Sequence, residues 1–432
     1  MPGAIDSKKP FGKLFCNLDD DVNALGADAP RKRLQQAAQL AIQVEFTTIP
    51  PYLTALYSIV DVSSRAYQLL RSVVMEEMFH VNQAANLLVA IGGQPRFTGN
   101  TAPAYPCYLP HANPKRTPYI GLCPASPEVF ENTFAAIEAP APPHAPAQDE
   151  QYDTIAQLYE FLSDGIIRYR RATLGPPLFD QSPRARQRTD IYLGKFGGKS
   201  MVVHDVATAL AGIDQIVQQG EGSVPVGQAM IAASQWGTYN HFGDRVDGTY
   251  GPIIGTPYEM SHFRKFRLVA LDVVNFPATY PITSNPKRSD FSNEVALRLV
   301  ETFDVAYSIM LDALEGSFVA LSHQPGEAPD PFFAQTLPLM HHVMPKLARG
   351  LMQTPMYSDG DSAVGPNAAP TYLYQTGCDA LAFKRQHTKA REAAIKATDR
   401  TRRDELMAML DDVQNYTAEL ISLQHSVSQA NY

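Results

Sequence analysis

The stretch of sequence that decides the fold is residues 69–91, which reads LLRSVVMEEMFHVNQAANLLVAI. Apolar side chains recur in it at intervals of three and four, a period that predicts an amphipathic α-helix. Ser63 or Ser64 precedes this helix as an N-cap, and Gly92-Gly93 ends it. Glu77 and His80 lie on its apolar face, and a carboxylate and an imidazole one turn apart there are typical of helix bundles that bind metal pairs.

The preceding segment carries a second buried carboxylate. Glu45 continues an apolar stripe at helical spacing, so its side chain points into the core of a helix that starts near residue 30. Pro50-Pro51 should end this helix at about residue 48, and Pro51 can open a further helical stretch to Ile59. A buried carboxylate needs a partner, and we predict that Glu45 shares a site with Glu77 and His80.

The same arrangement recurs in the second half of the chain. Glu221 ends an apolar helical stripe at 202–219, and Glu259 with His262 repeats the Glu-x-x-His spacing in a helix at 257–271. Two such halves would supply four carboxylates and two histidines to a di-metal site. Glu221 lies between two glycines and can equally face water, and Glu160 competes with it for the third-helix position.

Glu259 has an alternative role as well. Thr256 and Glu259 have the spacing of a capping box, in which the carboxylate would accept backbone N–H bonds instead of binding metal. The remaining candidates are tyrosines that lie near the proposed ligands in the sequence: Tyr52, Tyr159 and Tyr258. We predict that they line the site as catalytic residues, with a role as ordinary core aromatics as the alternative.

The rest of the chain suggests how the bundle is extended. Residues 94–150 are rich in proline and glycine, which predicts a long insertion running over the surface. Further helices are expected at about 151–170, 290–315, 331–353 and 378–427. We therefore predict an N-terminal extension (1–29), a bundle (30–271, with the insertion 94–150) and a C-terminal helical region packed on it (272–432). The charged last helix would lie on the surface or against a second subunit, as in a homodimer.

Composition narrows the functional class. The net charge of −8 and the absence of a long basic cluster argue against nucleic acid as a partner. No apolar run reaches the roughly 20 residues of a membrane span, and residues 1–13 lack a signal-peptide core, so we expect a cytoplasmic protein with no membrane partner. The four cysteines are expected to be reduced thiols.

Four stretches of the sequence match a known family: Gln43-Val-Glu-Phe with Pro50-Pro51-Tyr52, Glu76-Glu-Met-Phe-His80-Val, residues 205–222, and Glu259-Met-Ser-His262 through Phe266. Through them the chain resembles the ferritin-like domain of the iminophenyl-pyruvate dimer synthase type, found in violacein and indolocarbazole pigment pathways. The resemblance covers roughly residues 30–375. It implies an all-α, ferritin-like four-helix bundle that catalyses a metal-dependent oxidative step in specialised metabolism. This chain lacks the large extra region of the pigment synthases, so the identity of their substrate does not transfer.

The leading hypothesis is a non-haem di-iron oxidoreductase that uses O2 or a peroxide on a small, amino-acid-derived substrate. Carboxylates and imidazoles suit iron, and manganese is the alternative metal. Two other classes remain open: a ferroxidase or metal-storage protein with the same site, and a metal-free helical scaffold or binding protein. The predicted metal ligands are Glu45, Glu77, His80, Glu221, Glu259 and His262.

Overall fold

The prediction of an all-α protein is confirmed. The computed structural model describes residues 29–142, 145–148, 151–172, 177–191, 200–222, 260–320, 330–397 and 400–430. Within these ranges the regular structure is helical, and β-structure is limited to isolated bridges. No helix of the described chain is both long enough and apolar enough to cross a membrane.

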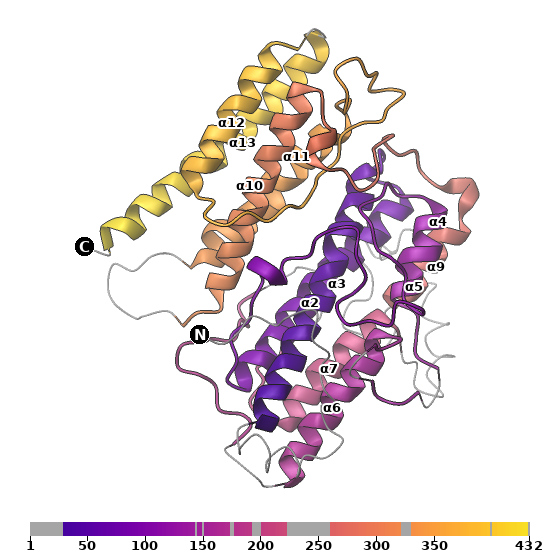
Figure 1. The fold of residues 1–432 in the computed structure, drawn as a ribbon, viewed down its shortest axis with the longest axis vertical. Helices are drawn as coiled ribbons and strands as arrows, with labels where there is room; N and C mark the ends of the chain where they lie inside the picture. The colour runs from indigo at the N-terminus through magenta and orange to yellow at the C-terminus, as the bar shows by residue number, and fades with distance from the viewer. Residues whose placement is uncertain are drawn as a thin grey trace, which may run out of the picture.

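Four long helices form the bundle that holds the candidate site. They are α2 (Ala29–Ser58), α3 (Arg65–Ala90), α6 (Ile155–Ala172) and α7 (Val206–Gly220). Helices α2 and α3 form a hairpin, α6 packs on α2, and α7 packs on both α3 and α6 (Figure 1). A shorter helix, α9 (His262–Leu271), lies against α3 and α7 at one end of this bundle.

Helix α2 runs without interruption through Pro50 and Pro51, whereas the sequence predicts that it ends before them. Proline has no N–H, so Pro51 leaves the carbonyl of Thr47, four residues earlier, without its helical donor. The hydroxyl of Tyr105 donates to that carbonyl at 2.7 Å. A side chain from the insertion therefore replaces the missing bond, and tertiary packing allows the helix to continue.

The predicted surface insertion is partly buried, which corrects the sequence interpretation of residues 94–150. A turn, η1 (Gly99–Thr101), is followed by a short helical stretch made of α4 (Pro127–Val129), the π turn η2 (Phe130–Phe134) and α5 (Ala135–Ile137). Phe130 and Phe134 are almost fully buried, and their rings pack against Phe266 of α9 with centroids 5.8 and 5.4 Å apart. Tyr52 of α2 joins the same aromatic cluster.

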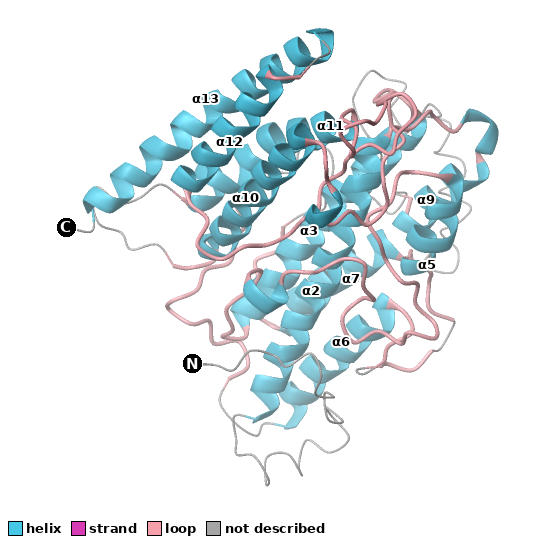
Figure 2. Cartoon of the chain, turned by 45° about the horizontal axis from the view of Figure 1, so that its top comes forward, coloured by secondary structure: helices cyan, strands magenta, loops and turns pink. Residues whose placement is uncertain are grey.

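The C-terminal region forms a second helical layer beside the bundle. Helix α10 (Glu294–Ser317) packs on α12 (Ala380–Ile395), and α12 packs on α13 (Arg400–Ala430), as Figures 1 and 2 show. In the sequence, α10 and α12 are separated by η6 (Phe332–Thr336), η7 (Leu339–Val343) and α11 (Met344–Met352). Helix α11 contacts α2. Two further turns, η4 (Val273–Asn275) and η5 (Arg288–Asp290), connect α9 to α10.

The single helix predicted at 378–427 is two helices in the structure. Neither glycine nor proline marks the break in the sequence, which follows Ile395. The division allows the small side chains of α12, Ala390 and Ala394, to be buried together with Leu406 and Leu410 of α13. Burial of both apolar faces against each other outweighs the continuity of one long helix.

The aromatic cluster gives a test of the correction to the insertion. Replacing Phe134 by alanine should lower the free energy of unfolding by about 3–5 kcal/mol, because a buried ring is lost and a cavity remains. Val274→Ala is the matched control, since Val274 is 95% exposed and its truncation should change stability by less than about 0.5 kcal/mol. Urea unfolding measures both, and an equally small loss for Phe134→Ala would contradict the buried position of the insertion.

Candidate metal centre

Helices α2 and α3 present three polar side chains to one buried space between them. Glu45 comes from α2, and Glu77 and His80 come from α3, one turn apart. Nδ1 of His80 lies 3.4 Å from Oε2 of Glu45 and 3.9 Å from Oε2 of Glu77. All three side chains are at most 3% exposed, so they meet out of contact with water.

Helix α9 brings a second imidazole to the same space. His262 is the first residue of α9, and Ser261 caps the helix by accepting a bond from the backbone N–H of Arg264. The ring of His262 stacks on that of His80 with centroids 5.2 Å apart. Glu77, His80 and His262 each offer one ligand atom within 4.8 Å of the others, as a metal site requires.

A third carboxylate comes from Glu138, which directly follows the short helix α5. Its Oε2 lies 3.8 Å from Nδ1 of His262, and its Oε1 accepts a hydrogen bond from the hydroxyl of Tyr52 at 2.7 Å. Tyr159 of α6 donates in the same way to Oε1 of Glu45 at 2.8 Å. The two tyrosines thus hold the outer oxygens of two carboxylates and leave the other oxygens facing the centre.

Both imidazoles are held by partners on the outside of the centre. Nε2 of His80 lies 2.9 Å from Oε1 of Gln219, and Nε2 of His262 lies 2.9 Å from Oε2 of Glu76. Lys265, one turn after His262, pairs with Glu76 through Nζ at 2.8 Å from Oε1. With acceptors at both Nε2 atoms, the Nδ1 atoms of the two rings face the centre, which is how histidine ligands are oriented in metal sites.

The electrostatics of the centre favour a bound cation. Burial and the negative charge of Glu138 raise the pKa of Glu77 well above its usual value, against the opposing effect of His262. Burial alone would lower the pKa of His262, but its contacts with Glu138, Glu76 and Glu77 raise it well above its usual value. Burial also opposes ionisation of Glu45, yet bonding to His80 and Tyr159 lowers its pKa overall. The centre therefore attracts positive charge.

The donor set fits a transition metal pair. Nδ1 of His262 lies 2.8 Å from Oε1 of Glu77 but outside hydrogen-bond geometry, and it has no hydrogen-bond partner within the described chain. A buried nitrogen in that state costs free energy unless it binds something. Three carboxylates and two inward-facing imidazoles are the ligand types that iron and manganese take in helix bundles.

The structure brings four of the predicted ligands together and separates another. Glu45, Glu77, His80 and His262 converge, whereas the carboxylate of Glu221, at the C-cap of α7, is bonded to backbone groups. Its carboxylate accepts backbone N–H bonds from Ala156 at 2.6 Å and Ala141 at 3.0 Å. It thereby caps the positive end of the α6 dipole, a role that the glycines around it did not suggest.

The other predicted residues have different outcomes. Glu160, the competitor of Glu221, is exposed on α6 and faces away from the centre. Tyr52 and Tyr159 are buried and bonded to candidate ligand carboxylates. Glu259 and Tyr258 lie outside the described residues, so their proposed roles stay predictions.

Glu138 was missed because it lies in the insertion that was expected on the surface. The sequence does contain a signal for it: Ser126 accepts from the backbone N–H of Val129 as an N-cap, and Pro127 occupies the first helical turn. Phe130, Phe134 and Ile137 then follow at helical spacing. The run is shorter than most helices and is bounded by prolines, so its period alone does not separate it from a loop.

Comparison with known proteins agrees with this fold. The sequence profile of the family described as Ferritin-like matches residues 38–270, more than half of the 432-residue chain. A similar solved structure is that of a ferritin like protein from Caulobacter vibrioides, with a TM-score of 0.50 and 24% sequence identity. The match covers 80% of this chain and 98% of that one, and at this identity it concerns the fold alone. No curated protein matches the chain.

The contrast between Glu138 and Glu221 can be tested by metal binding. Glu138→Gln should lower the amount of Co(II) or Fe(II) bound per chain, because one of the three converging carboxylates is lost. Glu221→Gln should bind as much metal as the unmodified protein, since its carboxylate is bonded to backbone N–H groups instead. Equilibrium dialysis followed by metal analysis measures both, and the reverse order of effects would restore Glu221 as the ligand.

The position of Glu221 also predicts a pH dependence of stability. Burial raises the pKa of its carboxyl group to about 7, against the lowering effect of two backbone bonds. Between about pH 4.5 and pH 7 the folded state then holds a proton that the unfolded state has lost, so stability falls as the pH rises. Across this window the unmodified protein should lose up to about 3 kcal/mol relative to Glu221→Gln.

Urea unfolding at pH 5 and pH 8 in the presence of a chelator measures this difference. Other titrating groups are common to both proteins and cancel in the comparison. If the two proteins show the same change between the two pH values, the carboxylate of Glu221 is already charged at pH 5.

Proposed function

Since the chain belongs to the ferritin-like family, we propose that it is a non-haem iron-dependent oxidoreductase with a two-metal centre. The residues proposed to hold the metal are Glu45, Glu77, His80, Glu138 and His262, with Glu259 as a further predicted ligand. The observation that carries the proposal is the convergence of three buried carboxylates with two imidazoles whose Nδ1 atoms face the same space. Manganese remains the alternative metal.

Iron bound there would supply the electrons that reduce dioxygen or a peroxide while a small organic substrate is oxidised. The protein's own part is to orient the ligands and exclude water. Burial and neighbouring carboxylates raise the pKa values of Tyr52 and Tyr159 well above their usual range, so both keep their protons. Each phenol therefore acts as a fixed hydrogen-bond donor that sets the angle of one carboxylate.

The ion pair of Glu76 and Lys265 orients His262 from outside the centre. Glu76 is fully buried and accepts from Nε2 of His262, while Lys265 balances its charge. A carboxylate behind a histidine raises the basicity of the ring and so strengthens its bond to a metal. Lys265 forms an ion pair with this carboxylate on the side away from the centre.

The substrate class rests on the family resemblance of the sequence. It supports an amino-acid-derived molecule and a role in specialised metabolism, and these finer statements are part of the proposal. The resemblance rests on the stretches around Glu45, Glu76-Glu77 and His262, the same stretches that form the centre.

Anaerobic loading with Fe(II) followed by exposure to oxygen tests the proposal. We expect about two iron ions per chain, as in carboxylate-bridged helix bundles, and consumption of dioxygen that depends on the bound iron. Glu77→Gln should reduce both quantities, because Glu77 lies between the two histidines. Glu221→Gln is the control that should change neither.

Two results would replace this function by another class. Assembly into a closed shell of many subunits, with iron accumulating far beyond two ions per chain, would indicate storage. Failure to bind Fe(II), with no increase of thermal stability on its addition, would indicate a metal-free scaffold, because any ligand that binds only the native state must stabilise it.

A further inference from the structure

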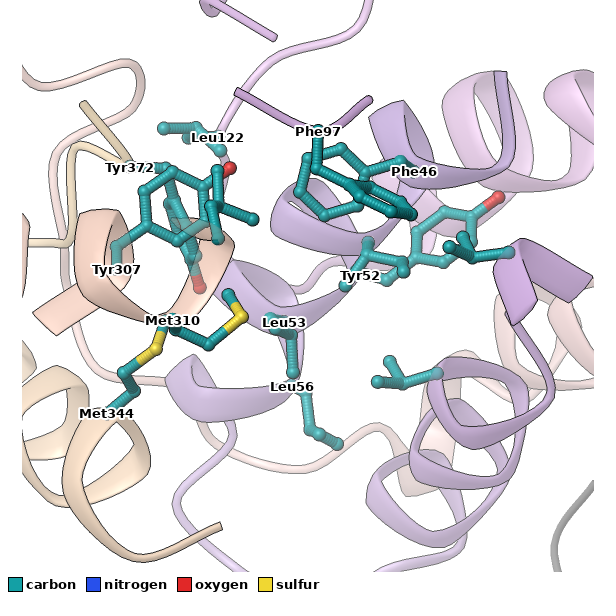
Figure 3. Close-up of a cluster of buried hydrophobic side chains, with 14 of the residues drawn as sticks. Phe46, Tyr52, Leu53, Leu56, Phe97, Leu122, Tyr307, Met310, Met344 and Tyr372 are labelled. Carbon is teal, nitrogen blue, oxygen red and sulfur yellow. The ribbon is translucent and has the colours of Figure 1, made fainter. Parts of the chain in front are cut away.

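A second internal space lies between the bundle and the C-terminal region. Helices α2 and α3 form one wall, and α10, η6, η7 and the start of α11 form much of the other. The cavity has a volume of about 80 Å³, several times the volume that one water molecule needs. Figure 3 shows part of its lining, with Tyr307, Tyr372 and Met310 on one side and Phe46 and Leu53 on the other.

This cavity is separate from the metal centre, although the same two helices line both. On α2 the centre is faced by Glu45 and Tyr52, whereas Phe46 and Leu53 line the cavity. At 100° per residue the mean directions of these two pairs lie about 100° apart around the helix axis. On α3, Met78 and Asn82 likewise line the cavity one and two residues after the ligands Glu77 and His80. A molecule in the cavity is therefore screened from the centre by the two helices.

Two polar atoms of residues that line the cavity have no hydrogen-bond partner within the described part of the chain. They are Oδ1 of Asn82 and the hydroxyl of Tyr307. A third polar group of the lining, the hydroxyl of Tyr372, interacts with the side chain of Thr54. Asn82, Tyr307 and Tyr372 are all at least 96% buried. Native proteins leave few buried polar atoms unpaired, because each costs about 1–3 kcal/mol. A molecule bound in the cavity would give the two unpaired atoms a partner.

The backbone at Tyr372 is held in a strained conformation that places its ring in the cavity wall. Its φ of 48° lies in the left-handed region, which is unfavourable for a residue with a bulky side chain. Asp304 of α10 fixes both neighbours: it accepts from the hydroxyl of Thr371 and from the backbone N–H of Leu373 at 3.0 Å. Strain that the surroundings maintain in this way is typical of ligand sites.

The charge of the lining restricts the ligand. The residues that line the cavity include no aspartate, glutamate, lysine, arginine or histidine among those that the structure describes. Nearby charged groups are paired elsewhere, as Arg188 is with Asp330 at 2.9 Å. An ionised ligand would thus be left without a counter-charge, which is costly in an apolar cavity.

From these observations we propose that the cavity is a binding site for an uncharged, mostly apolar small molecule that carries a hydroxyl or N–H group. A hydroxyl would donate to Oδ1 of Asn82 and accept from a tyrosine hydroxyl, whereas an N–H group would make the first of these bonds only. The apolar body would contact the phenylalanine and methionine side chains. Met78, Met310, Met340 and Met344 all belong to the lining, and their flexible thioethers can adapt to the shape of a ligand.

A more open cleft adjoins the cavity. It shares Leu53, Tyr57, Met78 and Met340 with the cavity and continues outward to Gln68 on α3. As part of the proposal, a ligand would enter from this cleft, past the side chains of Met78 and Met340.

A series of naphthalene derivatives tests the proposal. 2-Naphthol, which is neutral and has one hydroxyl, should bind to the full-length protein more tightly than naphthalene, and 2-naphthoate should bind more weakly than either. Tyr307→Phe and Tyr372→Phe should each weaken 2-naphthol by about two- to tenfold, the range expected for one hydrogen bond. Isothermal titration calorimetry or the fluorescence of the naphthol measures these affinities.

Several controls make the result specific. Naphthalene should bind the two tyrosine variants as well as the unmodified protein, which also shows that their cavities are intact. Tyr119→Phe, at a residue that is 56% exposed, should leave 2-naphthol binding unchanged. Glu77→Gln should also leave it unchanged, so the outcome does not depend on whether the metal centre binds iron.

The proposal is overturned if 2-naphthol does not bind, or if the double variant of Tyr307 and Tyr372 binds it with undiminished affinity. Tighter binding of 2-naphthoate than of 2-naphthol would also overturn it, because the ligand would then be an anion held by groups outside the cavity. In each of these cases the unpaired atoms of Asn82 and Tyr307 would be satisfied by water alone.

Discussion

The structure depends on the cost of placing carboxylates in an apolar helical core. Glu45, Glu76, Glu77 and Glu138 are all at least 97% buried in one region of the bundle. An unpaired ion in such surroundings is expensive, and like charges at short distance repel one another. Lys265 balances the charge of Glu76 in an ion pair. The other three carboxylates share only two imidazoles. This imbalance is the physical reason why the region suits cations.

The surrounding helices hold these charged side chains in place through hydrogen bonds. Three of the candidate ligands are held by partners from three different elements: α6 contributes Tyr159, α7 contributes Gln219 and α2 contributes Tyr52. The short helical stretch at 127–137 contributes Glu138 and is held in turn by packing on α9. Rigid supports of this kind keep ligand geometry fixed when the metal is absent.

The two long helices α2 and α3 serve two different environments. One face of each is polar and carries the candidate ligands, while an adjacent face is apolar and lines the cavity beside the C-terminal region. A helix turns 100° per residue, so neighbours in sequence such as Glu77 and Met78 face different compartments. The C-terminal helices are therefore a wall of an internal cavity as well as an outer layer, and removing them would expose that apolar face.

The spacing of apolar residues along single helices was sufficient to predict much of the candidate metal centre. The helical periods around Glu45, Glu77 and His80 predicted that these side chains point into the core, and the structure places them there. Periodicity has this power because the positions that share a face of a helix follow directly from 3.6 residues per turn. The all-α architecture followed from the same pattern over the whole chain.

Contacts between distant segments decided the rest. Whether Glu138 or Glu221 reaches the centre depends on how the insertion packs on α9, and the continuation of α2 through Pro51 depends on a hydroxyl from Tyr105. Such pairings join residues tens to hundreds of positions apart. The sequence by itself determined which faces of the helices are buried. Only the tertiary structure decided which buried faces meet, because that choice depends on packing across the whole core and not on local spacing.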